Sequence, residues 1–135
     1  MKTLFLAVLV IFATSAGFAQ QKEFQLSTHI LDVSAGLPAE GVTIKLEKMN
    51  PQTNTWDFVS EKKTSESGRV NDFLPSNENN EGTYRFTFMI EDYFKKMKEE
   101  TFYPFVEVAF KITGKNHYHV PITLSAFGYS TYRGS

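Results

Sequence analysis

Cysteine is absent from this chain of 135 residues. That absence excludes a disulfide framework, a thiolate zinc site, an iron–sulfur cluster and a cysteine nucleophile. An excess of charge of one sign is also missing, because 14 Lys and Arg residues stand against 15 Asp and Glu residues. This balance argues against a nucleic-acid binder, which usually carries a basic face. The length predicts one domain, which must be held together by its hydrophobic core.

Long hydrophobic runs are absent except for one of ten residues, Leu4–Ala13, which follows the positive charge of Lys2. The run is too short for the roughly 20 residues that a membrane-spanning helix requires. Small residues follow at Gly17 and Ala19, in the small-x-small pattern of the cleavage site of a secretory signal. We therefore expect a signal peptide over residues 1–19, cut after Ala19, and a mature domain over residues 20–135. The protein is then periplasmic or secreted, without membrane attachment after cleavage. The alternative is an uncleaved membrane anchor.

The remainder of the chain has the alternating pattern of half-buried β-strands. Tyr84–Ile90 is the clearest case, with apolar side chains at every second position. Glu91–Glu100 has helical spacing instead, and Asp92 is the expected N-cap. Turn residues recur often between short strands, which favours a sandwich. The prediction is an all-β domain, a β-sandwich of seven or eight strands with one short helix. The expected strands cover residues 24–33, 42–49, 56–63, 84–90, 105–113 and 117–124, and a strand-forming segment covers 128–133.

The three histidines are His29, His117 and His119. In the strand that holds the last two, the even positions are apolar or aromatic and belong to the core, so both histidines project from the opposite face. Pro121 in the same strand suits an edge or a bulge, because proline cannot donate a ladder hydrogen bond. The two histidines could bind a metal ion with a third ligand, or they could simply face solvent. Spacing alone does not decide between these alternatives.

Arg69 follows a glycine turn and could be an ordinary surface charge. A cleft that combined it with histidines would, however, suit hydrolysis without a metal. A neutral imidazole can accept a proton from water, and a guanidinium can stabilise a developing oxyanion. These residue types alone do not establish an enzyme.

Several segments together resemble a known family, the transthyretin-related proteins, and specifically its enzyme branch, the 5-hydroxyisourate hydrolases of purine catabolism. The matching segments span nearly all of residues 20–135, and they are residues 26–32, 36–39, 68–69, 92–96 and 117–135. The terminal Tyr-Arg-Gly-Ser is the most discriminating of them, because hormone-carrying transthyretins lack it.

The resemblance implies a transthyretin-like β-sandwich that assembles as a homotetramer, a dimer of dimers with sites in a channel. It implies a site without metal or cofactor. The implied catalytic residues are His29, Arg69 and His119. The implied substrate-binding residues are His29, Arg69, Tyr132, Arg133 and Ser135. His117 is assigned a supporting role only.

The activity implied by the resemblance is hydrolysis of 5-hydroxyisourate to 2-oxo-4-hydroxy-4-carboxy-5-ureidoimidazoline in urate degradation, by attack of water on a ring amide. One alternative is a transthyretin-like exported carrier of a small aromatic ligand, without catalysis. Another is an exported metal-binding protein that uses His117 and His119. The ionisable set His29, Arg69 and His119 favours the enzyme, because a carrier of apolar ligands has no need of such groups.

Overall fold

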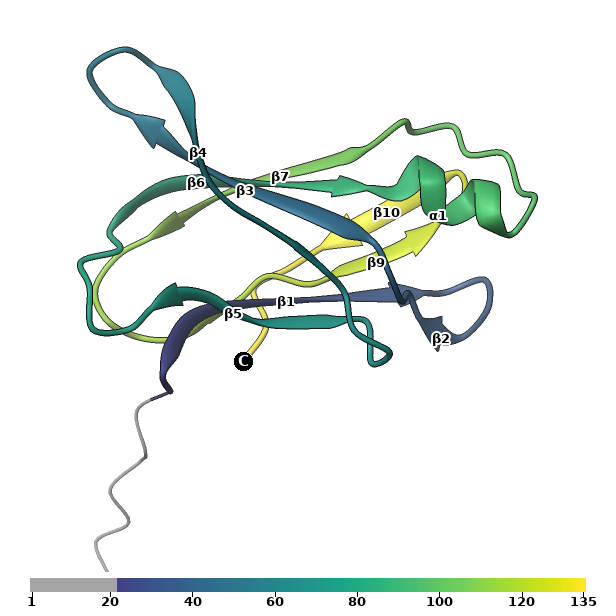
Figure 1. Ribbon diagram of the computed structural model, residues 1–135, viewed down its shortest axis with the longest axis horizontal. Helices are drawn as coiled ribbons and strands as arrows, with labels where there is room; N and C mark the ends of the chain where they lie inside the picture. Colours follow the sequence, from purple (N-terminus) through teal and green to yellow (C-terminus); the bar gives the residue numbers. More distant parts are fainter. Residues whose placement is uncertain (1–21) are drawn as a thin grey trace, which may run out of the picture.

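The computed structural model describes residues 22–135, so the predicted signal peptide lies outside the described residues. Two β-sheets form the two layers of a sandwich (Figure 1). The first, here called the β1 sheet, has the order β10-β9-β1-β2, and β5 and β8 also pair with β1. Its strands are β1 (Phe24–Asp32), β2 (Leu37–Pro38), β5 (Arg69–Pro75), β8 (Tyr118–His119), β9 (Ile122–Ser125) and β10 (Gly128–Thr131).

The second sheet, here called the β3 sheet, has the order β4-β3-β6-β7 and is antiparallel throughout. Its strands are β3 (Thr43–Asn50), β4 (Thr55–Lys63), β6 (Gly82–Met89) and β7 (Val106–Ile112). Residues 22–135 thus form ten strands, of which β2 and β8 have two residues each. The predicted β-sandwich is confirmed, with ten strands in place of the expected seven or eight, because the short β2 and the division of one expected strand into β8 and β9 add to the number.

The core lies between the two sheets and is rich in phenylalanine. Phe73 of β5 packs against Phe86 of β6, with ring centroids 5.1 Å apart, so this pair joins the two layers. Phe86 also contacts Phe88 and Phe110. The rings of Phe73, Phe86 and Phe88 are almost completely buried. Burial of each such side chain contributes about 1.5–3 kcal/mol. The alternation along β6 therefore fixes which face of the β3 sheet turns inward.

The helix α1 (Ile90–Lys96) is shorter than the predicted segment. Its N-cap is Met89, without a side-chain cap hydrogen bond, so the prediction of Asp92 as N-cap is wrong. Asp92 lies in the first turn instead, where its charge suits the helix dipole. The helix ends where Lys98 takes a positive φ of 56°. Burial of its apolar face against the core, rather than capping, sets where this helix begins.

The strand predicted over residues 117–124 is divided in two at Pro121. Tyr118 and His119 form β8, and the chain resumes at Ile122 as β9; both strands run parallel to β1. Pro121 has no N–H to give to the ladder, which explains the interruption. Its carbonyl accepts a hydrogen bond from Thr131 Oγ1 at 2.9 Å, which ties β10 to this point. β10 confirms a strand within the predicted segment 128–133.

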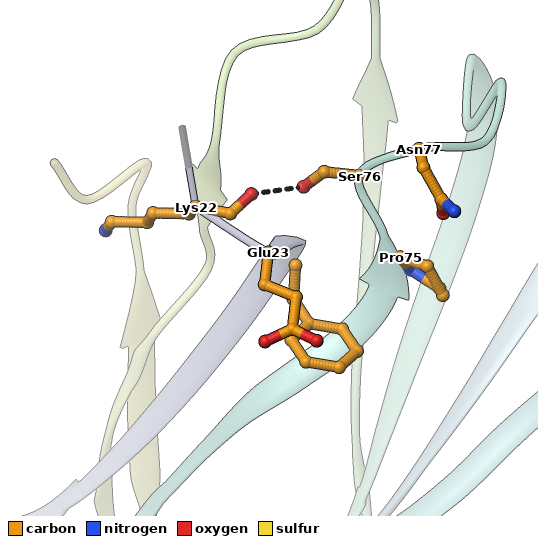
Figure 2. A pocket seen from close by; sticks show the side chains of 6 residues that line it. Lys22, Glu23, Pro75, Ser76 and Asn77 are labelled. Atoms are coloured by element: carbon orange, nitrogen blue, oxygen red, sulfur yellow. Dashed lines mark hydrogen bonds between the residues drawn. The ribbon is translucent and has the colours of Figure 1, made fainter. Parts of the chain in front are cut away.

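The start of β1 is fastened to the loop after β5. Ser76 Oγ donates to the Lys22 carbonyl at 2.7 Å, as Figure 2 shows, and the Ser76 N–H donates to the Glu23 carbonyl at 2.9 Å. A hollow of about 460 Å³ borders this junction, lined by Lys22, Glu23, Phe24, Pro75, Ser76 and Asn77. None of the predicted site residues lines it. Within residues 22–135, no helix has the length and hydrophobicity that a membrane span requires.

Candidate active site

β1 lies between the two strands that carry the other predicted catalytic residues. In the register of the sheet, His29 is opposite Arg69 on β5, and Ser27 is opposite His119 on β8. The sheet therefore brings His29, Arg69 and His119 together, although they come from distant parts of the sequence. The antiparallel pairing of β1 with β5 has an irregularity in register between Leu26 and Thr28.

The side chains of β1 alternate between the core and the face that carries the site. Leu26, Thr28 and Ile30 are completely buried on the core side. Ser27 and His29 project from the other face, here called the site face, as the odd positions of a strand must. Thr28 also donates its hydroxyl proton to the Val120 carbonyl at 2.7 Å, which holds β1 beside the segment that follows His119.

Three side chains and one backbone carbonyl form a continuous hydrogen-bonded chain on the site face. His117 Nδ1 lies 2.9 Å from the Phe24 carbonyl oxygen, and His117 Nε2 lies 2.9 Å from Ser27 Oγ. Ser27 Oγ in turn lies 2.8 Å from His119 Nδ1. Ser27 is only 5% exposed, because the two imidazoles cover it. His119 Nε2 is thus the ring nitrogen of His119 that does not take part in this chain.

The surroundings of His29 and His119 on the site face lower both pKa values and so favour the neutral imidazoles. Burial lowers the pKa of His119 from 6.5 to about 4, and the positive charge of Arg69 adds to that decrease. The pKa of His29 is also lowered, first by burial and then by Arg69, while a hydrogen bond to the Ser67 backbone opposes the shift. At neutral pH both imidazoles are therefore bases with a free lone pair.

The turn before β5 positions Arg69. Gly68 has a φ of +72°, and a Cβ at this position would lie 2.7 Å from the Ile30 carbonyl oxygen. The turn is closed by hydrogen bonds from Gly68 N–H to the Ser65 carbonyl and from Ser65 N–H to the Arg69 carbonyl. Glycine is therefore required here for both its conformation and its size. Among the ion pairs of residues 22–135, none involves Arg69.

The C-terminal tail returns to the site through Gly134. The Gly134 N–H donates to the His119 carbonyl at 2.8 Å, and the two residues form an isolated antiparallel bridge. A Cβ on Gly134 would lie 2.5 Å from His119 Cδ2 and 3.2 Å from Cγ. The backbone of the tail thus lies directly against the imidazole, and only glycine leaves room for it. The C-terminus accordingly lies beside β1 and β5 in Figure 1.

The other residues of the tail occupy different surroundings. The Arg133 guanidinium lies 4.3 Å from the centroid of the Tyr118 ring, a cation–π contact. Tyr132 is 60% exposed, and with Arg133 it borders a hollow of about 250 Å³ that is also lined by residues of β7. Ser135 is exposed at the end of the chain. Within one chain, the structure therefore does not bring Tyr132 and Arg133 to the three catalytic candidates.

Two residues at the site have no role in the sequence prediction. Ser27 connects both histidines of the His-x-His pair, and Asn71 lines a hollow of about 280 Å³ together with Ser27, His117 and the start of β1. Ser27 is two positions before His29 and so shares its face, which is the signal that could have identified it. The pairing of Ser27 with His119 could not be read from the sequence.

The proposed metal pair has little support from its surroundings. Within residues 22–135 there is no group of three or more His, Cys, Asp or Glu side chains placed to hold a metal ion. Both ring nitrogens of His117 have hydrogen-bond partners already. His117 and His119 therefore belong to a hydrogen-bonded chain with Ser27.

Comparison with known proteins shows what the chain is similar to. The model of the HIUase/Transthyretin family matches residues 26–134. A probable 5-hydroxyisourate hydrolase of Caenorhabditis elegans is 45% identical over 111 residues, which cover 82% of this chain and 81% of that protein. The structure of Klebsiella pneumoniae 5-hydroxyisourate hydrolase has a TM-score of 0.69 and 33% identity, covering 82% of this chain and 92% of that one. Sea bream transthyretin, solved with thyroxine, has a TM-score of 0.76 and 26% identity, covering 82% and 94%.

Proposed function

Because this chain belongs to the HIUase/transthyretin family, we propose that it is a hydrolase of 5-hydroxyisourate in urate catabolism. The observation that carries the proposal is the group of a neutral His119, His29 and Arg69 on one open face of the β1 sheet. The substrate is inferred from the matching proteins, which are named as hydrolases of 5-hydroxyisourate. The product is 2-oxo-4-hydroxy-4-carboxy-5-ureidoimidazoline.

In the proposed mechanism, His119 and His29 position a water molecule, and His119 takes its proton. A lowered pKa keeps His119 unprotonated at neutral pH, so the base is present in its active form. The Arg69 guanidinium binds the electron-rich substrate and stabilises the charge that develops on the attacked carbonyl oxygen. The strained ring amide then opens, and the leaving nitrogen is protonated. Each step uses proton transfer or charge stabilisation by side chains of this chain.

The terminal tetrapeptide completes the proposed site. Gly134 brings the tail against His119, and the Arg133–Tyr118 contact holds the tail in place. Tyr132, Arg133 and the Ser135 carboxylate are proposed to bind the substrate. In a single chain Tyr132 borders a hollow that His29, Arg69 and His119 do not line, so this part of the proposal needs either movement of the tail or a neighbouring subunit.

We further propose that the protein is an exported homotetramer, a dimer of dimers. Apolar side chains exposed near the edge of the β1 sheet support association, since Phe102, Phe127 and Tyr129 are 72%, 71% and 43% exposed. Light scattering of the purified mature protein should give four times the mass of one chain. Export predicts that the protein recovered from the periplasm or medium begins at Gln20, which mass spectrometry of the intact chain measures.

The remaining alternative is a carrier of a small aromatic ligand, which the likeness to sea bream transthyretin favours. The decisive experiment follows the ultraviolet absorbance of 5-hydroxyisourate, made freshly from uric acid with urate oxidase, after addition of the mature untagged protein. Acceleration over spontaneous decay that is lost in His119→Gln supports the hydrolase. Lys45→Gln on the opposite sheet is the matched control and should keep wild-type activity. A folded wild-type protein that does not accelerate the decay contradicts the hydrolase and favours the carrier.

A further inference from the structure

The hydrogen-bonded chain behind His119 has a direction that its atoms determine. A backbone carbonyl can only accept, so His117 Nδ1, 2.9 Å from the Phe24 oxygen, must carry a proton. In a neutral imidazole the other nitrogen is then an acceptor. Ser27 therefore donates its hydroxyl proton to His117 Nε2 at 2.9 Å.

The same reasoning fixes the tautomer of His119. Ser27 has a single hydroxyl proton, which is committed to His117, so toward His119 Nδ1 at 2.8 Å it can only accept. His119 Nδ1 therefore carries the proton, and His119 Nε2 carries the lone pair. The opposite tautomer requires Ser27 to accept from His117, and this happens only when His117 has protons on both nitrogens.

We propose that Ser27 and His117 form a proton relay behind His119, which presents His119 Nε2 as the base and transfers the proton taken from water to His117. Ser27 and His117 are positioning residues, because they act through His119. Ser27 is only 5% exposed, so its hydroxyl is largely shielded from solvent. The kinetic part of this inference rests on the proposed function, whereas the tautomer of His119 does not.

The transfer balances without any further reactant. Water gives a proton to His119 Nε2, and the N–H bond at His119 Nδ1 breaks as that proton passes to Ser27 Oγ. The original O–H bond of Ser27 breaks at the same time, and its proton forms an N–H bond at His117 Nε2. His117 is then the imidazolium, and His119 is neutral with a proton on Nε2. The reverse shift follows when Nε2 gives that proton to the leaving nitrogen.

The first test is the ¹⁵N spectrum of the histidine rings in the free wild-type protein at neutral pH. The relay requires a proton on Nδ1 of His119 and none on Nε2. In Ser27→Ala the two tautomers of His119 should be mixed. A proton on His119 Nε2 in the wild type would overturn the relay. Because no substrate is present, these spectra test the tautomer of His119 even if the protein does not hydrolyse 5-hydroxyisourate.

The second test uses turnover of 5-hydroxyisourate by matched variants. Ser27→Ala should lower kcat by about tenfold to a hundredfold, with KM within about twofold, because proton transfer rather than binding is impaired. Ser27→Thr, which restores a hydroxyl, should recover most of that loss. Thr28→Val is the control, since it removes an equally buried hydroxyl that bonds to Val120 instead of to a histidine. Equal kcat values in Ser27→Ala and Thr28→Val would contradict the relay.

His117→Gln separates the two functions of the relay. The glutamine amide can accept from Ser27 and so keep the tautomer of His119, but it cannot take up a proton. We expect the wild-type ring spectrum of His119 together with a kcat about tenfold lower. The dependence of kcat on the deuterium content of the solvent should be curved in the wild type, where several protons move, and linear in His117→Gln. Linear dependence in both would show that His117 receives no proton.

Discussion

The outer faces of the two sheets carry charge in different ways. On the β3 sheet, Glu47 accepts hydrogen bonds from Arg85 at 2.8 and 3.1 Å, and Lys45 and Glu107 extend the pairing. On the site face of the β1 sheet, Arg69 is accompanied by imidazoles. Among residues 22–135 no ion pair involves Arg69 or a histidine.

This difference separates charges that support the fold from charges that act on a ligand. Arg85 is balanced by carboxylates and also stacks on Trp56, with the guanidinium carbon 4.5 Å from the ring centroid, so it has little left to offer a ligand. Arg69 has a positive charge without such compensation, and it lowers the pKa values of both His29 and His119. The site face is thus suited to an electron-rich ligand and to a neutral base.

The two arginines offer the sharpest test of this comparison. Arg69→Gln should lower kcat/KM for 5-hydroxyisourate by about 100- to 1000-fold, as expected when a donor to a developing oxyanion is removed, and should leave the unfolding temperature nearly unchanged. Arg85→Gln should leave kcat/KM unchanged and lower the free energy of unfolding by about 1–3 kcal/mol, because Glu47 loses its partner. Similar losses of activity in both variants would remove the distinction between the faces.

Two glycines near the C-terminus form a second matched pair. Gly134→Ala should lower kcat by about a hundredfold, because its Cβ would overlap the His119 ring and displace either the tail or the base. Gly128→Ala places its Cβ 3.7 Å from Ser125 Oγ, an ordinary contact, and should keep full activity. Thermal unfolding of both variants should match the wild type. Full activity of Gly134→Ala would show that the tail does not determine the position of His119.

Tags at the two ends of the mature chain should have unequal effects. Residues added after Ser135 lie close to Gly134, which is bridged to His119. They should disturb this contact and lower kcat by roughly tenfold or more. A tag of the same length before Gln20 should leave kcat unchanged. Turnover of the two tagged proteins and of the untagged chain gives the comparison, and equal activity of both tagged forms would contradict it.

The smallest expected effect concerns pH. With a pKa of about 4, His119 stays neutral at higher pH, so kcat/KM should vary by less than about twofold between about pH 5 and 8 and fall below that range. The unfolded chain, with its histidines near 6.5, binds protons before the folded chain does, so stability should decrease as the pH falls from 6.5 toward 4. An activity limb near pH 6.5 would mean that activity is not controlled by a His119 with a pKa of about 4.

The sequence pattern allowed the sandwich and the position of the helix to be predicted, and the resemblance to a known family supplied the three catalytic candidates. The alternation of apolar and polar residues predicted that His117 and His119 lie on the face opposite Tyr118. This could be predicted because the alternation depends only on neighbouring residues in one strand. The pairing of β1 with β8 is not local, since Ser27 and His119 are 92 residues apart, and no pattern within either strand encodes it. For that reason the hydrogen bonds of Ser27 to both histidines were missed. The division of the last long strand did have a local signal, because Pro121 lacks the N–H that the ladder needs.

The parallel pairing of β1 with β8 also has a consequence for how the site is assembled in time. The β3 sheet draws on residues 43–112, so its strands have all been synthesised before His119. β1 is made first among the described strands, yet it must wait for β8, β9 and the returning tail before its site face is complete. Contacts so far apart in the sequence form slowly. We therefore expect that a product of synthesis that stops before β8 lacks His119 and has an incomplete site face.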